Sequence, residues 1–216
     1  MTLFDFILHI DVHLGQLIST YGILTYAILF VIIFIETGLV FTPFLQGDSL
    51  LFAAGAFSAL GSFNLLLLLL LLVLAAVLGD TANYWIGHFF GEKLIANPRI
   101  PLKKEHIAKT KKFFDKYGGK TIILARFVPI VRTFAPFVAG VGKMTYGKFV
   151  SFNIIGGIAW VLLFTLAGFW FGNLPLVKHN FSLVIMVIIL ISILPMIIEA
   201  ARHKLENKPA KKRLPV

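Results

Sequence analysis

Four ionisable side chains interrupt the most apolar parts of this sequence, and they form two groups of opposite charge. Glu36 and Asp48 stand on either side of a Pro-Phe-Leu-Gln-Gly break. Arg126 and Arg132 stand in a second apolar segment, just before a related Pro-Phe-Val-Ala-Gly break. Because an ionisable group is costly at membrane depth, its presence there usually indicates a function. Carboxylates near one break and guanidiniums near the other predict a transport site.

The two arginines are suited to binding an anion. A guanidinium presents a planar fork of donors that matches a phosphate group, and it keeps its proton. We therefore expect Arg126 and Arg132 to bind an anionic headgroup. Their spacing of six residues places them poorly on one helical face, but Pro129 between them can redirect both side chains toward one cavity.

The two carboxylates would exchange protons. The proton affinity of a carboxylate responds both to burial and to a neighbouring arginine, so Glu36 and Asp48 can bind and release a proton in each transport cycle. Two other interpretations stay open. The carboxylates can form the site of a proton or cation exchanger whose arginines tune them. Alternatively, all four residues can be buried ion pairs in a non-transporting membrane scaffold.

Prolines and glycines within the two breaks are expected to support the site. Pro43 and Pro136 each lack a backbone donor and should bend the chain, while Gly47 and Gly140 let it reverse or pack closely. Unsatisfied backbone groups in a membrane are tolerated only where protein or water surrounds them. We therefore expect both breaks to line one protected cavity.

Other polar residues interrupt the apolar helices that follow the breaks. Asp80 is followed one turn later by Tyr84. We expect Asp80 to be satisfied by Tyr84 or by a neighbouring arginine, or else to take part in transport. Asn153 and Trp160 are interpreted as residues of helix packing, with Asn153 supporting the site.

Enzymatic and metal chemistry find little support in the sequence. It contains no cysteine, which excludes disulfides and thiolate metal sites. His9 and His13 have the spacing of a metal-binding pair, but no third ligand is evident, so we interpret them as surface residues. Neither a phosphate-binding glycine loop nor a Gly-x-Ser-x-Gly motif is present. We expect no cofactor, no metal and no enzymatic activity.

Composition predicts an integral membrane protein. Of the 216 residues, 58% are hydrophobic and 14% are charged, whereas a soluble domain is about half apolar and about one quarter charged. Long apolar runs occupy 65–78 and 181–198.

The apolar segments predict an all-α polytopic membrane protein made of two inverted repeats. Each repeat would contain an amphipathic helix, a broken re-entrant hairpin and a transmembrane helix. The predicted segments are an N-terminal amphipathic helix at 1–20, a membrane domain at 21–172 with hairpins at about 22–61 and 119–145 and spans at about 63–90 and 149–172, a second amphipathic helix at 102–117, a C-terminal transmembrane helix at 181–201 and a basic cytoplasmic tail at 202–216.

The first hairpin is inferred from a shortfall in length. The segment 48–61 has about 14 residues, which cover about 21 Å as a helix, whereas the bilayer core is about 30 Å thick. A re-entrant segment explains the difference. The preceding segment 22–42 has about 21 residues and is long enough to span alone, which would place the N-terminus in the cytoplasm.

Short matches suggest that the two halves are an internal repeat. Three of them occur in the same order in both halves, and they are Tyr21-Gly22 with Tyr117-Gly118, Pro43–Gly47 with Pro136–Gly140, and Ser62–Asn64 with Ser151–Asn153. Each match is weak by itself, but their shared order predicts a duplicated unit.

The distribution of positive charge predicts the orientation. The net charge is +10, no lysine or arginine precedes Lys93, nine lie within 93–120 and six within 202–213. Short loops rich in these residues stay in the cytoplasm, so the C-terminus is expected inside and the two hairpins enter from opposite faces. Because the charges flank apolar segments, anionic lipid headgroups are expected as partners instead of nucleic acid.

At these motifs the chain resembles the DedA family, whose shared unit is also called the VTT or SNARE-associated domain. The resemblance covers about Tyr21 to Gly172. Its motifs are Glu36 with Pro43-Phe-Leu-x-Gly-Asp48, Gly79-Asp80 with Tyr84 and Gly87, Arg126-Phe-x-Pro129-x-x-Arg132-Thr with Pro136 and Gly140, and Asn153-x-x-Gly156-x-x-x-Trp160. The family usually has a second proline where this chain has Gln46.

The resemblance implies a bacterial inner-membrane protein with paired re-entrant hairpins. It implies a role in envelope homeostasis that depends on the proton motive force. Members of the family are proposed to return undecaprenyl phosphate or other phospholipids across the membrane. The acids and arginines that match Glu36, Asp48, Arg126 and Arg132 form the family's functional set.

Overall fold

The computed structural model describes residues 22–39, 47–96, 104–175 and 177. Within these ranges every regular element is a helix and no strand occurs. The helices are α3 (Ile23–Gly38), α4 (Gly47–Ala59), α5 (Leu65–Ala96), α6 (Lys104–Tyr117), the short 3-10 helix η1 (Gly118–Lys120), α7 (Thr121–Ala125), α8 (Pro129–Val141) and α9 (Tyr146–Gly172). The predictions for 1–20, 181–201 and 202–216, and those for Pro43, His9 and His13, lie outside the described residues.

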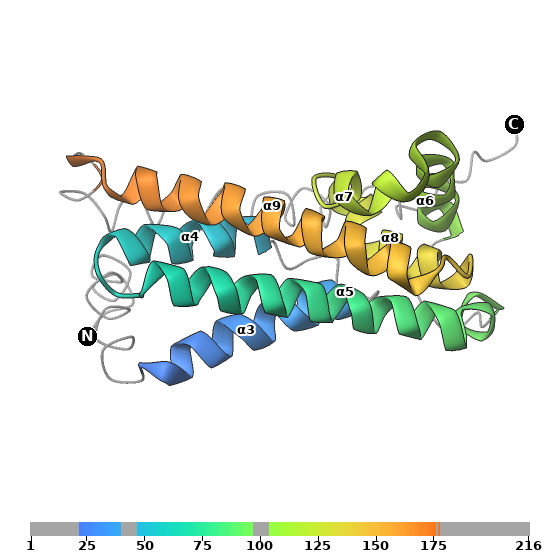
Figure 1. Ribbon diagram of the computed structural model, residues 1–216, viewed down its shortest axis with the longest axis horizontal. Coiled ribbons are helices and arrows are strands. Elements are labelled where there is room, and N and C mark those ends of the chain that lie inside the picture. The colour runs from blue at the N-terminus through green and yellow to red at the C-terminus, as the bar shows by residue number, and fades with distance from the viewer. Residues whose placement is uncertain (1–21, 40–46, 97–103, 176, 178–216) are drawn as a thin grey trace, which may run out of the picture.

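Two long apolar helices form the axis of the molecule. α5 and α9 are in contact and run in opposite directions (Figure 1). Their apolar stretches Leu65–Gly91 and Tyr146–Gly172 have 27 residues each, about 40 Å of helix, which is more than the roughly 20 residues that a bilayer requires. Large apolar side chains such as Leu66 and Trp170 are exposed on their outer faces. The expectation of an all-helical chain with two long apolar helices is confirmed.

The first pair of short helices lies over one half of this axis. α3 packs against α5, and α4 packs against α9 (Figure 1). α3 has 16 residues and α4 has 13, so they are about 24 Å and 20 Å long, each shorter than the roughly 30 Å bilayer core. α3 ends beside the middle of α5, where a Cβ on Gly38 would lie 3.4 Å from the carbonyl oxygen of Gly79.

The second pair of short helices, α7 and α8, lies over the other half of the axis. The break between these two helices differs from the one that the sequence predicted. The chain leaves helical geometry between Ala125 and Pro129, and Val128 is extended. Pro129 opens α8, where a missing N–H costs nothing because the first helical N–H groups have no partner within the helix. Pro136 lies inside a continuous α8. The prediction that Pro136 forms the break is therefore wrong.

Glycines allow the short helices to approach the long ones closely. A Cβ on Gly55 of α4 would lie 2.0 Å from the carbonyl oxygen of Thr165, and one on Gly168 of α9 would lie 2.0 Å from that of Phe52. A comparable contact joins α8 to α5, where a Cβ on Gly140 would lie 2.1 Å from the carbonyl oxygen of Tyr84. Only glycine permits such distances between backbones.

The sequence matches between the two halves do not occupy equivalent places in the helices. Gly47 is the first residue of α4, whereas Gly140 is the penultimate residue of α8. Asn64 precedes α5, whereas Asn153 lies inside α9. These two markers are therefore wrong as a structural alignment of the halves.

We expect Gly168→Ala to destabilise the protein by about 1–3 kcal/mol, because the new methyl group overlaps the backbone of α4 and forces the two helices apart. The measurement is the midpoint of thermal unfolding in detergent. It is obtained from the fraction of protein that still elutes as folded protein after heating.

Gly147→Ala is the matched control, since Gly147 lies in the same helix and a Cβ there meets nothing within 4 Å. It should be neutral or slightly stabilising, because alanine favours helix. Equal midpoints for the two variants would refute the close-packing argument.

Candidate functional site

Arg132 joins the two sides of the first break. Arg132 lies in the first turn of α8. Its Nη1 donates to Asp48 Oδ1 at 2.6 Å, and its Nη2 donates to Glu36 Oε1. Glu36 comes from the last turn of α3 and Asp48 from the first turn of α4. Three of the four charged residues that the sequence singled out are therefore in direct contact. A single guanidinium fork bridges two carboxylates.

The backbone at Gly47 completes the environment of Glu36. The N–H of Gly47 donates to Glu36 Oε1 at 3.0 Å, and a Cβ on Gly47 would lie 2.0 Å from Glu36 Oε2. A larger residue at this position would displace the carboxylate. Glu36 is 5% exposed, whereas 37% of the Asp48 side chain is accessible, so the network is open on the Asp48 side.

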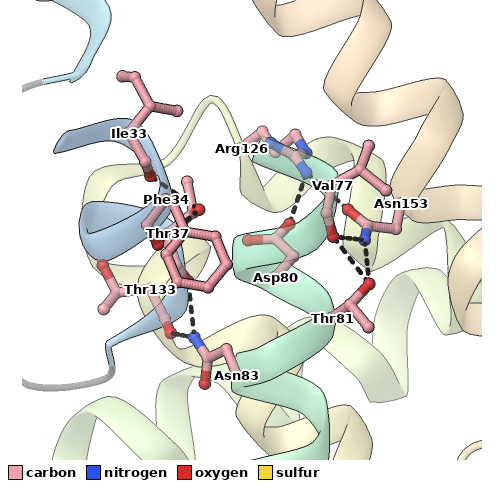
Figure 2. A network of polar contacts seen from close by, with 10 residues as sticks. All are labelled: Ile33, Phe34, Thr37, Val77, Asp80, Thr81, Asn83, Arg126, Thr133 and Asn153. Carbon is pink, nitrogen blue, oxygen red and sulfur yellow. Dashed lines mark hydrogen bonds and ion pairs between the residues drawn. The ribbon is translucent and has the colours of Figure 1, made fainter. Parts of the chain in front are cut away.

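Arg126 has different partners. At the end of α7, its Nη2 donates to Asp80 Oδ2 and to Asn153 Oδ1, both at 2.6 Å, and Figure 2 shows this group. Asn153 in turn donates to the carbonyl oxygen of Val77 at 3.0 Å. Arg126 and Asp80 are 4% and 5% exposed. Arg126 thus ties α7 to α5 and α9, and it forms no ion pair with Glu36 or Asp48.

Tyr84 is not a partner of Asp80. Its hydroxyl donates to the carbonyl oxygen of Met144, and its ring stacks on Phe149 with centroids 4.4 Å apart. Of the two partners that the sequence allowed for Asp80, the structure selects the arginine. Tyr84 supports the site indirectly, by holding the chain before α9 against α5.

Trp160 belongs to the network, which corrects its interpretation as a packing residue. Its indole N–H donates to Asp48 Oδ1 at 2.7 Å. Its ring centroid lies 5.1 Å from the guanidinium carbon of Arg132 and 5.7 Å from that of Arg126, within the range of cation–π attraction. A tryptophan in the middle of an apolar helix was an available signal, because tryptophan in membrane helices favours the interface and its buried N–H needs a partner.

Asn83 is a further residue that sequence reasoning missed. It is fully buried, and its Nδ2 donates to the carbonyl oxygens of Thr37 at 3.1 Å and Thr133 at 3.0 Å (Figure 2). The Thr37 carbonyl lies in the last turn of α3, where the helix supplies no partner. One amide therefore fixes the end of α3 and the first half of α8 relative to each other. The signal in the sequence was an amide close after Asp80 in an apolar helix.

A small cavity lies within the network. Its volume is about 10 Å³ and its lining includes Glu36, Asp80, Arg126, Arg132 and Trp160, so it has room for roughly one water molecule. Among the described residues, the buried Glu36 Oε2 and Arg126 Nε have no hydrogen-bond partner. Charged groups line part of the cavity, and it is too small for a lipid headgroup in this conformation.

These features define a class: an all-helical membrane protein with a paired ionic network between two long apolar helices. The VTT domain family model matches residues 42–169. The chain is 57% identical to Protein DedA of Escherichia coli (strain K12) over 205 residues, which cover 94% of each chain. This protein belongs to the DedA family, also known as the VTT domain family.

Two more distant relatives are also membrane proteins. The chain is 46% identical to an uncharacterized membrane protein of Mycobacterium tuberculosis (strain H37Rv) over 175 residues, covering 80% of this chain and 77% of the relative. It is 34% identical to inner membrane protein YqjA of Escherichia coli (strain K12) over 151 residues, covering 69% of each. No solved structure matches the chain.

We expect Asp80 and Arg126 to be energetically coupled. Asp80→Asn or Arg126→Gln alone leaves one buried charge without its partner, which should lower the free energy of unfolding by about 3–5 kcal/mol. The double variant should cost about 1–3 kcal/mol less than the sum of the single variants. The measurement is unfolding of the purified protein in mixed micelles with increasing sodium dodecyl sulfate.

The control for this cycle combines Asp80→Asn with Lys93→Gln. Lys93 is exposed on the same helix, far enough along it for the two effects to add. Additivity of the Asp80 and Arg126 variants would contradict the proposed pair.

Proposed function

We propose that this protein is a multi-pass transporter of the bacterial inner membrane that translocates a phosphate-bearing lipid, such as undecaprenyl phosphate or a phospholipid, coupled to protons. This activity would support envelope homeostasis. The observation that carries the proposal is the fork of Arg132, which two carboxylates occupy on opposite sides of a helix break. A phosphate is the anion that such a fork fits best.

The depth of the network supports a role in crossing the membrane. Asp80 lies within about 3 Å of the midpoint of the apolar stretch Leu65–Gly91, and Trp160 lies within about 2 Å of the midpoint of Tyr146–Gly172. If both helices span the bilayer, the paired charges lie near its centre. Secondary transporters place their substrate and ion sites at this depth, at breaks in helices.

The pattern of helix contacts supports two inverted repeats. Contacts of α4 with α9 correspond to contacts of α8 with α5, and contacts of α3 with α5 correspond to those of α7 with α9. Because α5 and α9 run in opposite directions (Figure 1), the two short pairs would enter as re-entrant hairpins from opposite faces. With the basic segments inside, the second hairpin and the C-terminus would face the cytoplasm.

The contacts suggest how proton binding and anion binding exclude each other. While Glu36 and Asp48 are ionised, they accept the donors of Arg132. Proton uptake removes their negative charge and weakens these charge-assisted bonds, so the fork becomes available to a phosphate oxygen. Release of the protons returns the carboxylates to Arg132 and displaces the anion. Asp48 is the accessible carboxylate and would take part first.

Arg126 has a supporting role in this scheme. Its Nη2 is already used by Asp80 and Asn153, so it adds positive charge to the site without offering a free fork. The network as a whole contains three carboxylates and two guanidiniums, and one bound proton would balance the charge of the set. Lipid translocation thus depends on Arg132 more than on Arg126.

The size of the cavity favours a second candidate function. A volume of about 10 Å³ accommodates a water molecule, which suits proton or cation exchange without a lipid. In that case the carboxylates would be the ion site, and Arg132 would set their proton affinity. A non-transporting scaffold is the third outcome that the following experiments distinguish.

We expect Arg132→Ala to reduce lipid translocation at least about tenfold, because two charge-assisted hydrogen bonds to phosphate are worth several kcal/mol. Arg132→Lys should not restore it, since an ammonium lacks the planar fork. The assay follows a fluorescent polyprenyl phosphate in liposomes that contain the protein, with and without a pH gradient.

Lys93→Gln is the matched control, because it removes one positive charge outside the network. It should translocate at the rate of the unmodified protein. Translocation at an unchanged rate by folded Arg132→Ala would show that the headgroup role is wrong.

Glu36→Gln should leave lipid movement measurable but insensitive to the pH gradient. The amide oxygen of glutamine can still accept the N–H of Gly47, while the titrating proton is lost. The same liposome assay, run over a range of imposed gradients, measures this. Retained gradient dependence would exclude Glu36 as the coupling group. Cation flux without lipid movement would favour the exchanger, and movement of neither would favour the scaffold.

A further inference from the structure

A second and much larger cavity lies at the basic end of the molecule. Its volume is about 860 Å³, and it is bounded by α6, η1, the C-terminal half of α8 and the start of α9. This size is within the range of ligand sites in proteins. Its lining includes Lys111, Phe114, Val138, Met144, Lys148 and Phe152.

The lining is amphiphilic. Phe114, Met144 and Phe152 are partly buried and present apolar surface, whereas Lys111 and Lys148 are exposed. Neither lysine forms an ion pair within the described part of the chain. Asp115 also lines the cavity, so its charged lining carries a net charge of about +1 at neutral pH. An apolar interior beside a cationic rim is complementary to a lipid that carries a single phosphate.

The walls of this cavity are held in place. The carbonyl oxygen of Met144 accepts the hydroxyl of Tyr84, which fixes the turn between α8 and α9 against α5. In the same turn Lys143 has a φ of 51°, and Gly118, which also lines the cavity, has a φ of 57°. A Cβ on Gly119 would lie 2.6 Å from the ring of Phe152. Specific contacts therefore hold the turn before α9 and pack η1 against α9.

One helix lines both cavities. The central cavity is lined by Arg132, Thr133, Ala135 and Pro136 of α8, and the large one by Val138, Ala139 and Val141 of α8 and by Gly142, which follows it. Their centres are about six residues apart, or about 9 Å along the helix. The two cavities therefore lie one after the other along the same helix.

We propose that the large cavity binds one single-phosphate lipid from the bilayer, with the phosphate facing Lys111 and Lys148 and the acyl or prenyl chain lying against Phe114, Met144 and Phe152. The inference rests on the proposed function in one respect: this lipid would be the cargo before it reaches Arg132. Binding itself does not require transport, and the two can be measured separately.

The test uses the full chain in phosphatidylcholine liposomes with a phosphatidic acid probe that carries a photoreactive diazirine in one acyl chain. After illumination, the labelled peptides are identified by mass spectrometry. Labels are expected in the peptides that contain Phe114, Met144 or Phe152. Lys111→Gln with Lys148→Gln should reduce this labelling at least about tenfold, because the phosphate loses its charge-assisted contacts at the rim.

Three comparisons make the result specific. Lys109→Gln with Lys112→Gln removes the same charge from exposed positions of α6 that do not line the cavity, and it should reduce labelling less than the variant of Lys111 and Lys148 does. Lys111→Arg with Lys148→Arg should retain it. A diacylglycerol probe with the same chains but no phosphate should label these peptides at the level of the glutamine variant.

Equal labelling by both lysine-to-glutamine variants, or by both probes, would overturn the inference, and so would labels confined to other peptides. Specific labelling without translocation in liposomes would support the cavity while refuting the proposed transport. Translocation that proceeds without any labelling at this cavity would refute the cavity and leave the proposed function standing.

Discussion

Charge buried among apolar helices must be paired, and this constraint organises the centre of the protein. Glu36, Asp80 and Arg126 are almost inaccessible, and each carries an ion pair with a residue distant in sequence. A buried charge that lost its partner would cost several kcal/mol. The short helices must therefore end where their charges meet, beside the middle of α5 and α9. The ends of the short helices and the position of the small cavity are both consistent with this requirement.

The two arginines satisfy the constraint in different ways. Arg126 is bonded to residues of the two long helices, so these contacts would persist if α3 and α4 moved. Within the described parts of the chain, Arg132 forms ion pairs only with residues of α3 and α4. A change in the protonation of those carboxylates therefore acts on Arg132 and leaves the Arg126 group intact. In the proposed cycle, the Arg126 pair would stay in place while the contacts of Arg132 exchange.

The second cavity extends this arrangement toward the basic end of the molecule. α8 carries Arg132 in its first turn and lines the large cavity in its last two turns. Asn83 holds the first half of this helix to α3, while Tyr84 holds the turn that follows it. Neighbouring residues of α5 thus position both ends of α8. A ligand at one cavity and a proton at the other would act on the same rigid element.

Much of this protein could be predicted from its sequence. The hydropathy of a segment, and the free-energy cost of an ionisable residue within it, depend only on nearby residues. Apolar composition predicts the long helices. Because burying an ionisable residue in apolar surroundings costs free energy, the sequence alone marks four candidate residues, which are Glu36, Asp48, Arg126 and Arg132. Which charges pair is not local: Arg126 meets Asp80 across 46 positions and Arg132 meets Glu36 across 96. Pro136 inside a helix, Trp160 and Asn83 as polar partners, and the large cavity depend on how helices pack. Only the tertiary structure decided these features, because a hydrogen bond or a cavity exists only once separate segments are brought together.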